Sequence, residues 1–296
     1  LSLSLKKTHP LVGSFLFLFV FLLLLFTSTQ SMAFDDETVR FALIIGNGNY
    51  ETAPLPNAIN DANAISTMLS KLNFNVTKVI DSNYFELKEI VNVFYANVTA
   101  IHDKDKFILI YYAGHAIQVE HRNYLVPIDS FLENSDINTE DSASRGLVRL
   151  KNASNQDPQA NLFDLTTLLE FSNDANSTQS IIILDACRNN PFKNNEGSSF
   201  SSGLAPIKAP TGTLIAYATE PGSVASDGAG ENGTYTKHLL RHMEEMIAIE
   251  ELLKKVRKGV VKETQNNQIP WEHSSLLEQV FINPPKNKKI PELMVF

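Results

Sequence analysis

The sequence predicts an α/β fold built on a mostly parallel β-sheet with helices on both faces. Short apolar runs of strand length alternate with longer segments in which apolar residues recur every three or four positions, the pattern of helices packed on a sheet. Over residues 39–112 the order is strand, helix, strand, helix, strand, which requires crossover connections and parallel pairing. The consecutive apolar residues at 181–184 suit a strand that is covered on both faces.

The first half of the chain supplies three of the expected strands and two of the expected helices. The strands are residues 39–45, 74–80 and 106–112, and the helices are residues 57–72 and 84–100. After the first strand, Gly-Asn-Gly-Asn-Tyr at 46–50 is interpreted as a turn, because Glu51 stands where the third glycine of a dinucleotide-binding loop belongs. Residues 117–128 are expected to form a short hairpin, and the polar residues 129–157 a surface excursion.

The second half continues the alternation and contains one long loop. A helix is expected at 163–171, strands at 180–186 and 212–218, helices at 234–246 and 249–265, a final strand at 274–282 and an irregular tail from 283. Residues 192–211 are rich in Gly, Ser, Asn, Pro and Lys, which predicts a loop of a length that is usually functional or mobile.

The N-terminus has the pattern of a secretory signal peptide over residues 1–33. Lys6 and Lys7 precede an almost unbroken apolar run at 11–26, and small residues stand three and one positions before a cut after Ala33. The run is shorter than the roughly 20 residues that a spanning helix needs. The chain is therefore expected to be secreted or periplasmic. The alternative is a protein anchored in the membrane by an uncleaved leader.

The rest of the chain is long enough for one large α/β domain, expected at residues 38–284 and followed by an irregular tail at 285–296, although its length would also fit two small domains. A net charge of −8 argues against nucleic acid as a partner, and contact with a membrane is expected only if the leader stays uncleaved. The chain has one cysteine, so no internal disulfide can form.

Two of the apolar strands lead to a potential nucleophile and a potential base. His115 follows the strand at 106–112, and Cys187 follows the strand at 180–186. Parallel neighbours end at the same edge of a sheet about 4.8 Å apart, so an imidazole and a thiol there can face one substrate bond. Such a cysteine needs a base to form its thiolate and N–H donors for the oxyanion, which Gly114 and Cys187 itself could offer. The ordinary alternative is a small, buried, unreactive cysteine.

Both residues belong to longer motifs that resemble those of the caspase-like cysteine peptidases, most closely the bacterial caspase-homologue and metacaspase branch. Tyr-Tyr-Ala-Gly-His at 111–115 resembles the family's catalytic histidine motif, and Asp-Ala-Cys-Arg-Asn-Asn-Pro at 185–191 its catalytic cysteine motif. The similarity extends to residues 60–62, 217–222, 232–236 and 270–276. It therefore covers about residues 38–284.

The resemblance implies a fold, a reaction and a set of roles. The fold is a caspase-like three-layer sandwich, with a six-stranded, mostly parallel sheet whose last strand is antiparallel. The reaction is peptide-bond cleavage by a Cys-His dyad, with Cys187 as nucleophile, His115 as general base, and Gly114 and Cys187 as oxyanion donors; no metal or other cofactor is expected. One departure is Ala116, where such sequences usually have glycine. If that position needs a positive φ, alanine is strained there.

The resemblance also predicts which peptide bonds are cleaved. Caspases that cut after aspartate bind the substrate acid with an arginine after the fifth strand, and the equivalent position here is Asp227. Asp61 and Asp185 match acidic pocket positions of metacaspases, so three carboxylates are expected around one basic side chain. Taken singly, Asp61 could be a solvated helix residue, and Asp185 and Asp227 could be turn residues. Together they predict cleavage after arginine or lysine.

We therefore expect a cysteine endopeptidase that acts on proteins or peptides with basic residues. The loop at 192–211 carries Lys193 and Lys208, and it could be cut by the enzyme itself or remain intact. One rival interpretation is a catalytically silent caspase-like interaction domain, against which the presence of both His115 and Cys187 counts. Another is an α/β ligand-binding domain with a structural cysteine.

Overall fold

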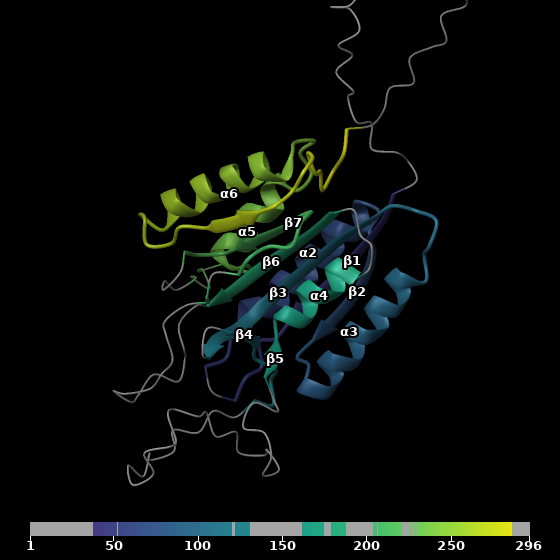
Figure 1. Cartoon of the computed structure of the whole chain (residues 1–296). Coiled ribbons are helices and arrows are strands. Elements are labelled where there is room, and N and C mark those ends of the chain that lie inside the picture. Colours follow the sequence, from purple (N-terminus) through teal and green to yellow (C-terminus); the bar gives the residue numbers. More distant parts are fainter. Residues whose placement is uncertain are drawn as a thin grey trace, which may run out of the picture. The chain divides into compact units, whose positions relative to one another are not determined.

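Six strands form the central sheet of the computed structural model, in the order β2-β1-β3-β6-β7-β8 (Figure 1). The structure describes residues 38–51, 53–119, 122–130, 162–174, 179–187, 204–205, 207–220, 225, 228 and 230–285. The strands are β1 (Val39–Gly46), β2 (Asn75–Ile80), β3 (Lys106–Val119), β6 (Gln179–Cys187), β7 (Thr213–Tyr217) and β8 (Trp271–Ser274). Pairing between neighbours is parallel except that β8 runs antiparallel to β7, which confirms the predicted sheet.

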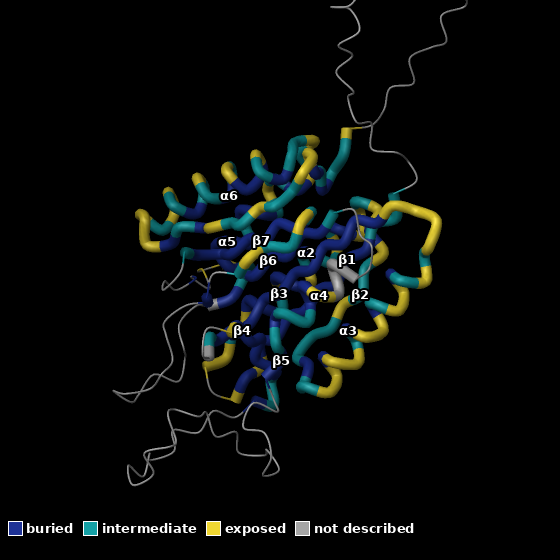
Figure 2. The backbone as a smooth tube through the Cα atoms, viewed as in Figure 1, coloured by how far each residue is buried: buried dark blue, intermediate teal, exposed yellow. Residues whose placement is uncertain are grey.

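Helices cover both faces of this sheet and make a three-layer α/β sandwich (Figure 1). One face carries α2 (Pro56–Lys71), α5 (Thr234–His242) and α6 (Ile249–Glu263), and the other carries α3 (Tyr84–Thr99) and α4 (Thr166–Asp174). Successive strand residues enter alternate cores: Ile181 and Ile183 face the first set of helices, and Ile182 and Leu184 the second. Figure 2 shows buried strands between helices whose outer sides are exposed. Burial on both faces explains the continuous apolar runs in the sequence.

Local sequence features mark the beginnings of helices α2 and α3 close to where the sequence predicts them. At the beginning of α3 the side chain of Asn83 accepts a hydrogen bond from the Glu86 N–H (2.9 Å), and the Glu86 carboxylate accepts one from the Asn83 N–H (3.0 Å). This reciprocal capping box satisfies two N–H groups that have no partner within the helix. Helix α2 begins with Pro56, which needs no donor at the first helical position.

Strand β3 does not stop at Tyr112, as predicted, but continues to Val119. The prediction was wrong because the strand changes partners: it pairs with β1 as far as Ala113 and, from Ala116 onward, with β4 (Arg122–Leu125). The second pairing is antiparallel, so the predicted hairpin at this point is confirmed. As a result His115 lies inside a strand and not in the loop after it.

The expected final strand at 274–282 is wrong. Strand β8 covers Trp271–Ser274, and the apolar residues after it form no strand. They are apolar because they fill the core: Val280 and Ile282 are fully buried in the cluster that packs under α6. The Val280 carbonyl accepts a hydrogen bond from the N–H of Ile249 (2.7 Å), which ties this segment to the first residue of α6.

Arg40 attaches the same C-terminal segment to the sheet. Its guanidinium donates to the carbonyls of Leu72 (2.8 Å), Phe281 (3.1 Å) and Ile282, and it lies 4.1 Å from the centre of the Phe74 ring. Burial lowers the pKa of Arg40 to about 10, so the group remains charged at neutral pH. The guanidinium of Arg40 therefore links strand β1 to two other backbone segments, one at Leu72 and one at Phe281 and Ile282.

Smaller differences concern the ends of helices. Helix α5 ends at His242 and not at 246, and a two-residue strand, β5 (Phe163–Asp164), precedes α4 and pairs with β4.

The predicted leader at 1–33 and most residues of the predicted segments 129–157 and 192–211 lie outside the described residues. Within the part of the chain that the structure describes, no helix has the length and apolarity needed to cross a membrane.

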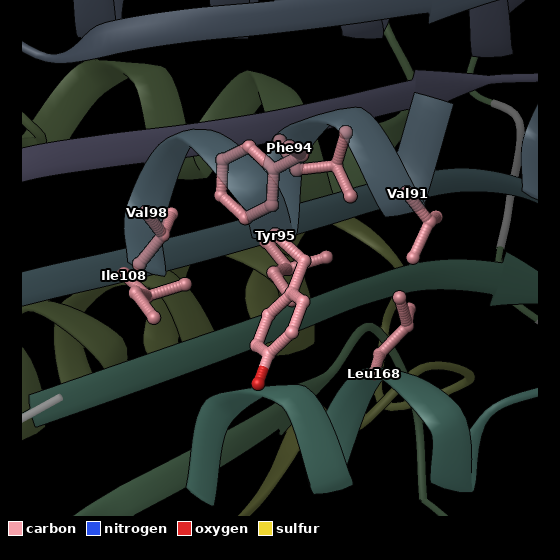
Figure 3. A pocket seen from close by; sticks show the side chains of 8 residues that line it. Val91, Phe94, Tyr95, Val98, Ile108 and Leu168 are labelled. Atoms are coloured by element: carbon pink, nitrogen blue, oxygen red, sulfur yellow. The ribbon is translucent and has the colours of Figure 1, made fainter. Parts of the chain in front are cut away.

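A small apolar cavity lies between α3, α4 and the sheet (Figure 3). Its volume is about 10 Å³, and its lining includes Val91, Phe94 and Val98 of α3, Leu168 of α4 and Ile108 of β3. A space of this size would hold about one water molecule, but an apolar lining offers that water almost no hydrogen-bond partners. We therefore interpret it as a dry packing gap in the core.

Replacing Arg40 with methionine should lower the free energy of unfolding by about 2–4 kcal/mol, because three carbonyl groups lose a charged donor. The measurement is urea unfolding followed by circular dichroism. Arg122→Met is the matched control: that side chain is mostly exposed and pairs with Asp164 at the surface, so the loss should stay below about 1 kcal/mol. Equal losses in the two variants would contradict the structural role given to Arg40.

Candidate functional site

His115 and Cys187 occupy opposite positions on the two central strands of the sheet. Strands β3 and β6 pair in parallel, and His115 opposite Cys187 is the last pair of the register. Neighbouring strands lie about 4.8 Å apart, so these two residues are neighbours although they are distant in sequence. On the other side of β3, strand β1 ends at Gly46, opposite Ala113, so the chain after β1 can reach His115. The structure thus brings the predicted base and nucleophile together at the carboxyl edge of the sheet.

The imidazole of His115 is buried, and a backbone carbonyl determines which nitrogen carries the hydrogen. Only 3% of the residue is exposed, and Nε2 lies 2.7 Å from the carbonyl oxygen of Ala53. Because a carbonyl can only accept, Nε2 carries the hydrogen, and Nδ1 has the lone pair in the neutral ring. Burial lowers the pKa of His115 below its ordinary value, and the Ala53 carbonyl opposes this shift. At neutral pH the ring is therefore an uncharged base.

Two buried tyrosines hold the backbone of His115. The Tyr50 hydroxyl accepts a hydrogen bond from the His115 N–H (3.0 Å) and donates one to the Val126 carbonyl (2.9 Å), while the Tyr50 ring packs on the imidazole with 4.5 Å between ring centres. The Tyr112 hydroxyl donates to the His115 carbonyl (2.5 Å). Both backbone groups of the histidine are thus bonded to side chains that the core immobilises.

Glycine is required at position 114 but not at position 116. Gly114 has φ +156°, and a Cβ there would lie 2.6 Å from the Tyr112 hydroxyl and 2.8 Å from the Tyr50 hydroxyl. Ala116 is not among the described residues with a positive φ; it is buried and pairs with Leu125. The strain that a positive φ would have caused at Ala116 therefore does not arise.

Asp61 of α2 and Asp185 of β6 approach each other beside Gly233, the residue before α5. A Cβ on Gly233 would lie 2.8 Å from Asp61 Oδ2 and 3.6 Å from Asp185 Oδ2, so both carboxylates lie close to the Gly233 backbone and a side chain at this position would collide with Asp61. The Gly233 N–H donates to Asp61 Oδ1 (3.0 Å). Alternation along β6 puts Asp185 on the α2 and α5 face of the sheet, the face of Ile181 and Ile183.

The first turn of α5 and the residues just before it bind both carboxylates. The amide of Asn232 donates to Asp61 Oδ1 (2.8 Å), and the hydroxyl of Thr236 donates to Asp185 Oδ2 (2.6 Å). Because the Thr236 hydrogen goes to Asp185, the buried Tyr111 hydroxyl, 2.6 Å from Thr236 Oγ1, donates to that oxygen. The positive end of the α5 dipole also favours negative charge at this place.

The end of the predicted loop at 192–211 is attached to the body of the protein. The side chain of Asn123 donates to the Ala205 carbonyl (2.8 Å) and accepts from the Ala205 N–H (2.7 Å), and His273 Nδ1 lies 3.1 Å from the Ile207 carbonyl. Lys208, one of the two lysines of the loop, is exposed within this attached stretch.

The remaining predicted features lie elsewhere or are not described. Asp227, the third predicted pocket carboxylate, and Lys193 lie outside the described residues. In the described part of the chain no three His, Cys, Asp or Glu side chains are grouped as metal ligands would be. The cavity of Figure 3 lies on the α3 and α4 face, opposite to Asp185.

Sequence reasoning missed the groups that position the predicted residues. Tyr50 and Ala53 follow the carboxyl end of β1, where a loop in a parallel sheet commonly crosses the site, and this was the signal that could have identified them. Gly233 and Thr236 belong to a segment that resembled the family, but their contacts with the carboxylates join residues far apart in sequence. No local pattern reports such contacts.

Comparison with protein families matches residues 39–282 to the caspase domain. Among curated proteins, the chain is similar to the Homo sapiens protein named mucosa-associated lymphoid tissue lymphoma translocation protein 1, with 25% identity over 265 residues. Its Mus musculus homolog is 25% identical over 252 residues. These alignments cover 88% and 83% of this chain but only 28% and 27% of the relatives, so the chain spans less than a third of their length.

Gly114→Ala should destabilise the protein by more than about 2 kcal/mol, because the new methyl group would collide with two immobilised hydroxyls at a backbone conformation that L-residues rarely adopt. Thermal unfolding measures the effect. Gly230→Ala provides the comparison, since a Cβ at Gly230 has nothing within 4 Å and should change the melting temperature little. A Gly114→Ala protein as stable as Gly230→Ala would show that the tyrosine hydroxyls are not held as described.

Proposed function

The chain belongs to the caspase domain family, and from this premise we propose that it is a cysteine endopeptidase that cleaves after arginine or lysine. In this proposal Cys187 is the nucleophile and His115 is the general base. The observation that carries it is the register of the two central strands, in which His115 stands directly opposite Cys187 as the last pair of the β3–β6 ladder. A silent interaction domain would not need a buried imidazole with a defined tautomer beside the one cysteine.

The state of His115 suits the first step of this reaction. With Nε2–H bonded to the Ala53 carbonyl, Nδ1 is the nitrogen that takes the thiol proton of Cys187 as the sulfur attacks the peptide carbonyl. The imidazolium then gives this proton to the leaving amine when the C–N bond breaks. Water, deprotonated by His115, hydrolyses the thioester and restores the thiol. In the tetrahedral intermediates, we propose the N–H groups of Gly114 and Cys187 as donors to the oxyanion.

The proposed preference for basic residues rests on Asp61 and Asp185. Both carboxylates lie beside Gly233, and Asp185 belongs to the same strand as Cys187, two residues earlier. In the proposal, a lysine or arginine side chain of the substrate pairs with these two carboxylates, whose charges otherwise repel each other. In the proposal Asp227 adds a third carboxylate, as the resemblance of the sequence motifs to those of metacaspases and caspases implies.

Cys187→Ala and His115→Ala should each reduce kcat/KM for basic fluorogenic peptides by at least about 10⁴-fold, because a nucleophile and its base act as a unit. The control for the histidine is His102→Ala, an exposed residue in the loop before β3, which should leave activity unchanged. Circular dichroism should show that all variants are folded.

A wild-type protein that cleaves neither basic nor acidic peptides would favour the silent interaction domain, and a Cys187→Ala protein that still turned over substrate would end the peptidase proposal.

Intact-mass analysis of the wild type and of Cys187→Ala also tests self-cleavage of the loop at 192–211. If it occurs, we expect the cut after Lys193, because Lys208 lies in the stretch that Asn123 and His273 attach to the body. One identical intact species in both preparations would exclude self-cleavage.

The wild type should prefer arginine over aspartate before the scissile bond by more than about a hundredfold, because an acidic side chain would add a like charge to the pocket at a cost of several kcal/mol. Asp61→Asn, Asp185→Asn and Asp227→Asn should each lower kcat/KM for arginine peptides without creating cleavage after aspartate, since two carboxylates remain. Asp103→Asn, at an exposed site before β3, is the charge-matched control and should have no effect. Aspartate preferred by the wild type would reverse the assigned substrate class.

A further inference from the structure

The acceptor for His115 is supplied by a short loop, residues 47–55, that leaves β1 and returns to α2. A hydrogen bond from the Leu55 N–H to the Gly48 carbonyl closes the loop (2.9 Å). The two ends lie so close that a Cβ on Gly48 would be 2.6 Å from the Leu55 carbonyl oxygen. The position of the Ala53 carbonyl relative to His115 Nε2 therefore depends on how this closed loop is held.

Ala53 has a backbone conformation that alanine rarely adopts. Its φ is +56°, in the left-handed region, which costs a residue with a Cβ about 1–2 kcal/mol. Such a conformation persists only where the surrounding structure imposes it, and it commonly marks a functional constraint. In this loop the strained residue Ala53 directs its carbonyl oxygen at His115, and that oxygen lies 2.7 Å from Nε2 of the imidazole.

The carboxylate of Asp81, the residue after β2, holds the other end of the loop. Its Oδ1 accepts hydrogen bonds from the N–H groups of Gly48 (2.8 Å) and Asn49 (2.9 Å), and its Oδ2 accepts one from the Asn49 side chain (2.5 Å). The Asp81 N–H donates to the Gly46 carbonyl (2.8 Å), which places the carboxylate at the point where the loop begins. Bonds from N–H groups to an ionised acceptor are the stronger kind of hydrogen bond.

We propose that Asp81 is a positioning residue for His115: by clamping the start of the loop at 47–55, it keeps the Ala53 carbonyl in place and thereby keeps the hydrogen on Nε2 and the lone pair on Nδ1. Asp81 itself does not touch the imidazole. The consequence for catalysis rests on the proposed function, in which Nδ1 is the base. The consequence for the tautomer does not, because it depends only on the described contacts.

The test combines NMR of the ¹⁵N-histidine-labelled full chain with steady-state kinetics. Wild type should show His115 as the Nε2–H tautomer with a slowly exchanging ring proton. Asp81→Ala should accelerate exchange of that proton and mix the two tautomers, and it should lower kcat on the order of tenfold while KM changes less than about twofold. Asp81→Asn, which keeps one acceptor oxygen and tolerates the positive φ of +51° at this position, should give a smaller loss of the same kind.

Asp129→Ala is the matched control, because the Asp129 carboxylate also accepts a hydrogen bond from a backbone N–H, that of Tyr84 at the start of α3 (3.0 Å). It should leave the His115 signal and kcat unchanged. A wild-type tautomer and exchange rate in both Asp81 variants would overturn the proposal, even if the protein is an active peptidase. If the wild type lacks peptidase activity, the NMR comparison still decides whether Asp81 positions the imidazole. If Asp81→Ala does not fold, Asp81→Asn provides the same comparison.

Discussion

The parallel pairing of β3 with β6 is the constraint on which the candidate site depends. In this ladder each residue of one strand has a defined partner on the other, so one register sets His115 opposite Cys187 and Ala113 opposite Asp185. A slip by one residue would turn every side chain of the strand to the opposite face. Both faces pack against helices, so such a slip would move the side chains of each core into the other and disrupt the packing of both. The relative positions of His115, Cys187 and Asp185 thus depend on burial of the strands on both sides of the sheet.

The two helix layers contribute unequally to the site. The α2, α5 and α6 layer supplies Asp61, which accepts the Gly233 N–H, and Thr236 in the first turn of α5, which donates to Asp185. The α3 and α4 layer closes the opposite core and contains the small dry cavity of Figure 3. The proposed dyad therefore lies at the ends of the central strands, and the proposed acidic residues lie on the face that α2 and α5 cover. Substitutions in the α3 and α4 layer should act through stability and not through substrate choice.

The histidine is oriented mostly by groups other than charged side chains. A backbone carbonyl bonds its ring, and two tyrosine hydroxyls bond its N–H and its carbonyl. These groups are neutral, so they can be buried against the sheet without the desolvation cost of an ion. They require instead a closely fitted backbone, visible in the positive φ of Ala53 and in the exclusion of a Cβ at Gly114. The backbone strain at Ala53 thus accompanies the orientation of an uncharged imidazole by a carbonyl group.

The sequence by itself determined the α/β class, the order of strands and helices, and the family motifs that contain His115 and Cys187, because periodicity, turn residues and motif spacing are local properties of the chain. It could not determine how far β3 extends, because a strand continues as long as it finds partners, and β4 becomes a partner only after folding. It assigned a strand to residues that in fact fill the core beside Arg40, since burial and strand pairing produce the same apolar pattern. The contacts of Ala53 with His115, Gly233 with Asp61 and Thr236 with Asp185 were decided by the tertiary structure alone, because each joins groups that only the folded sheet and its helices bring within hydrogen-bond distance.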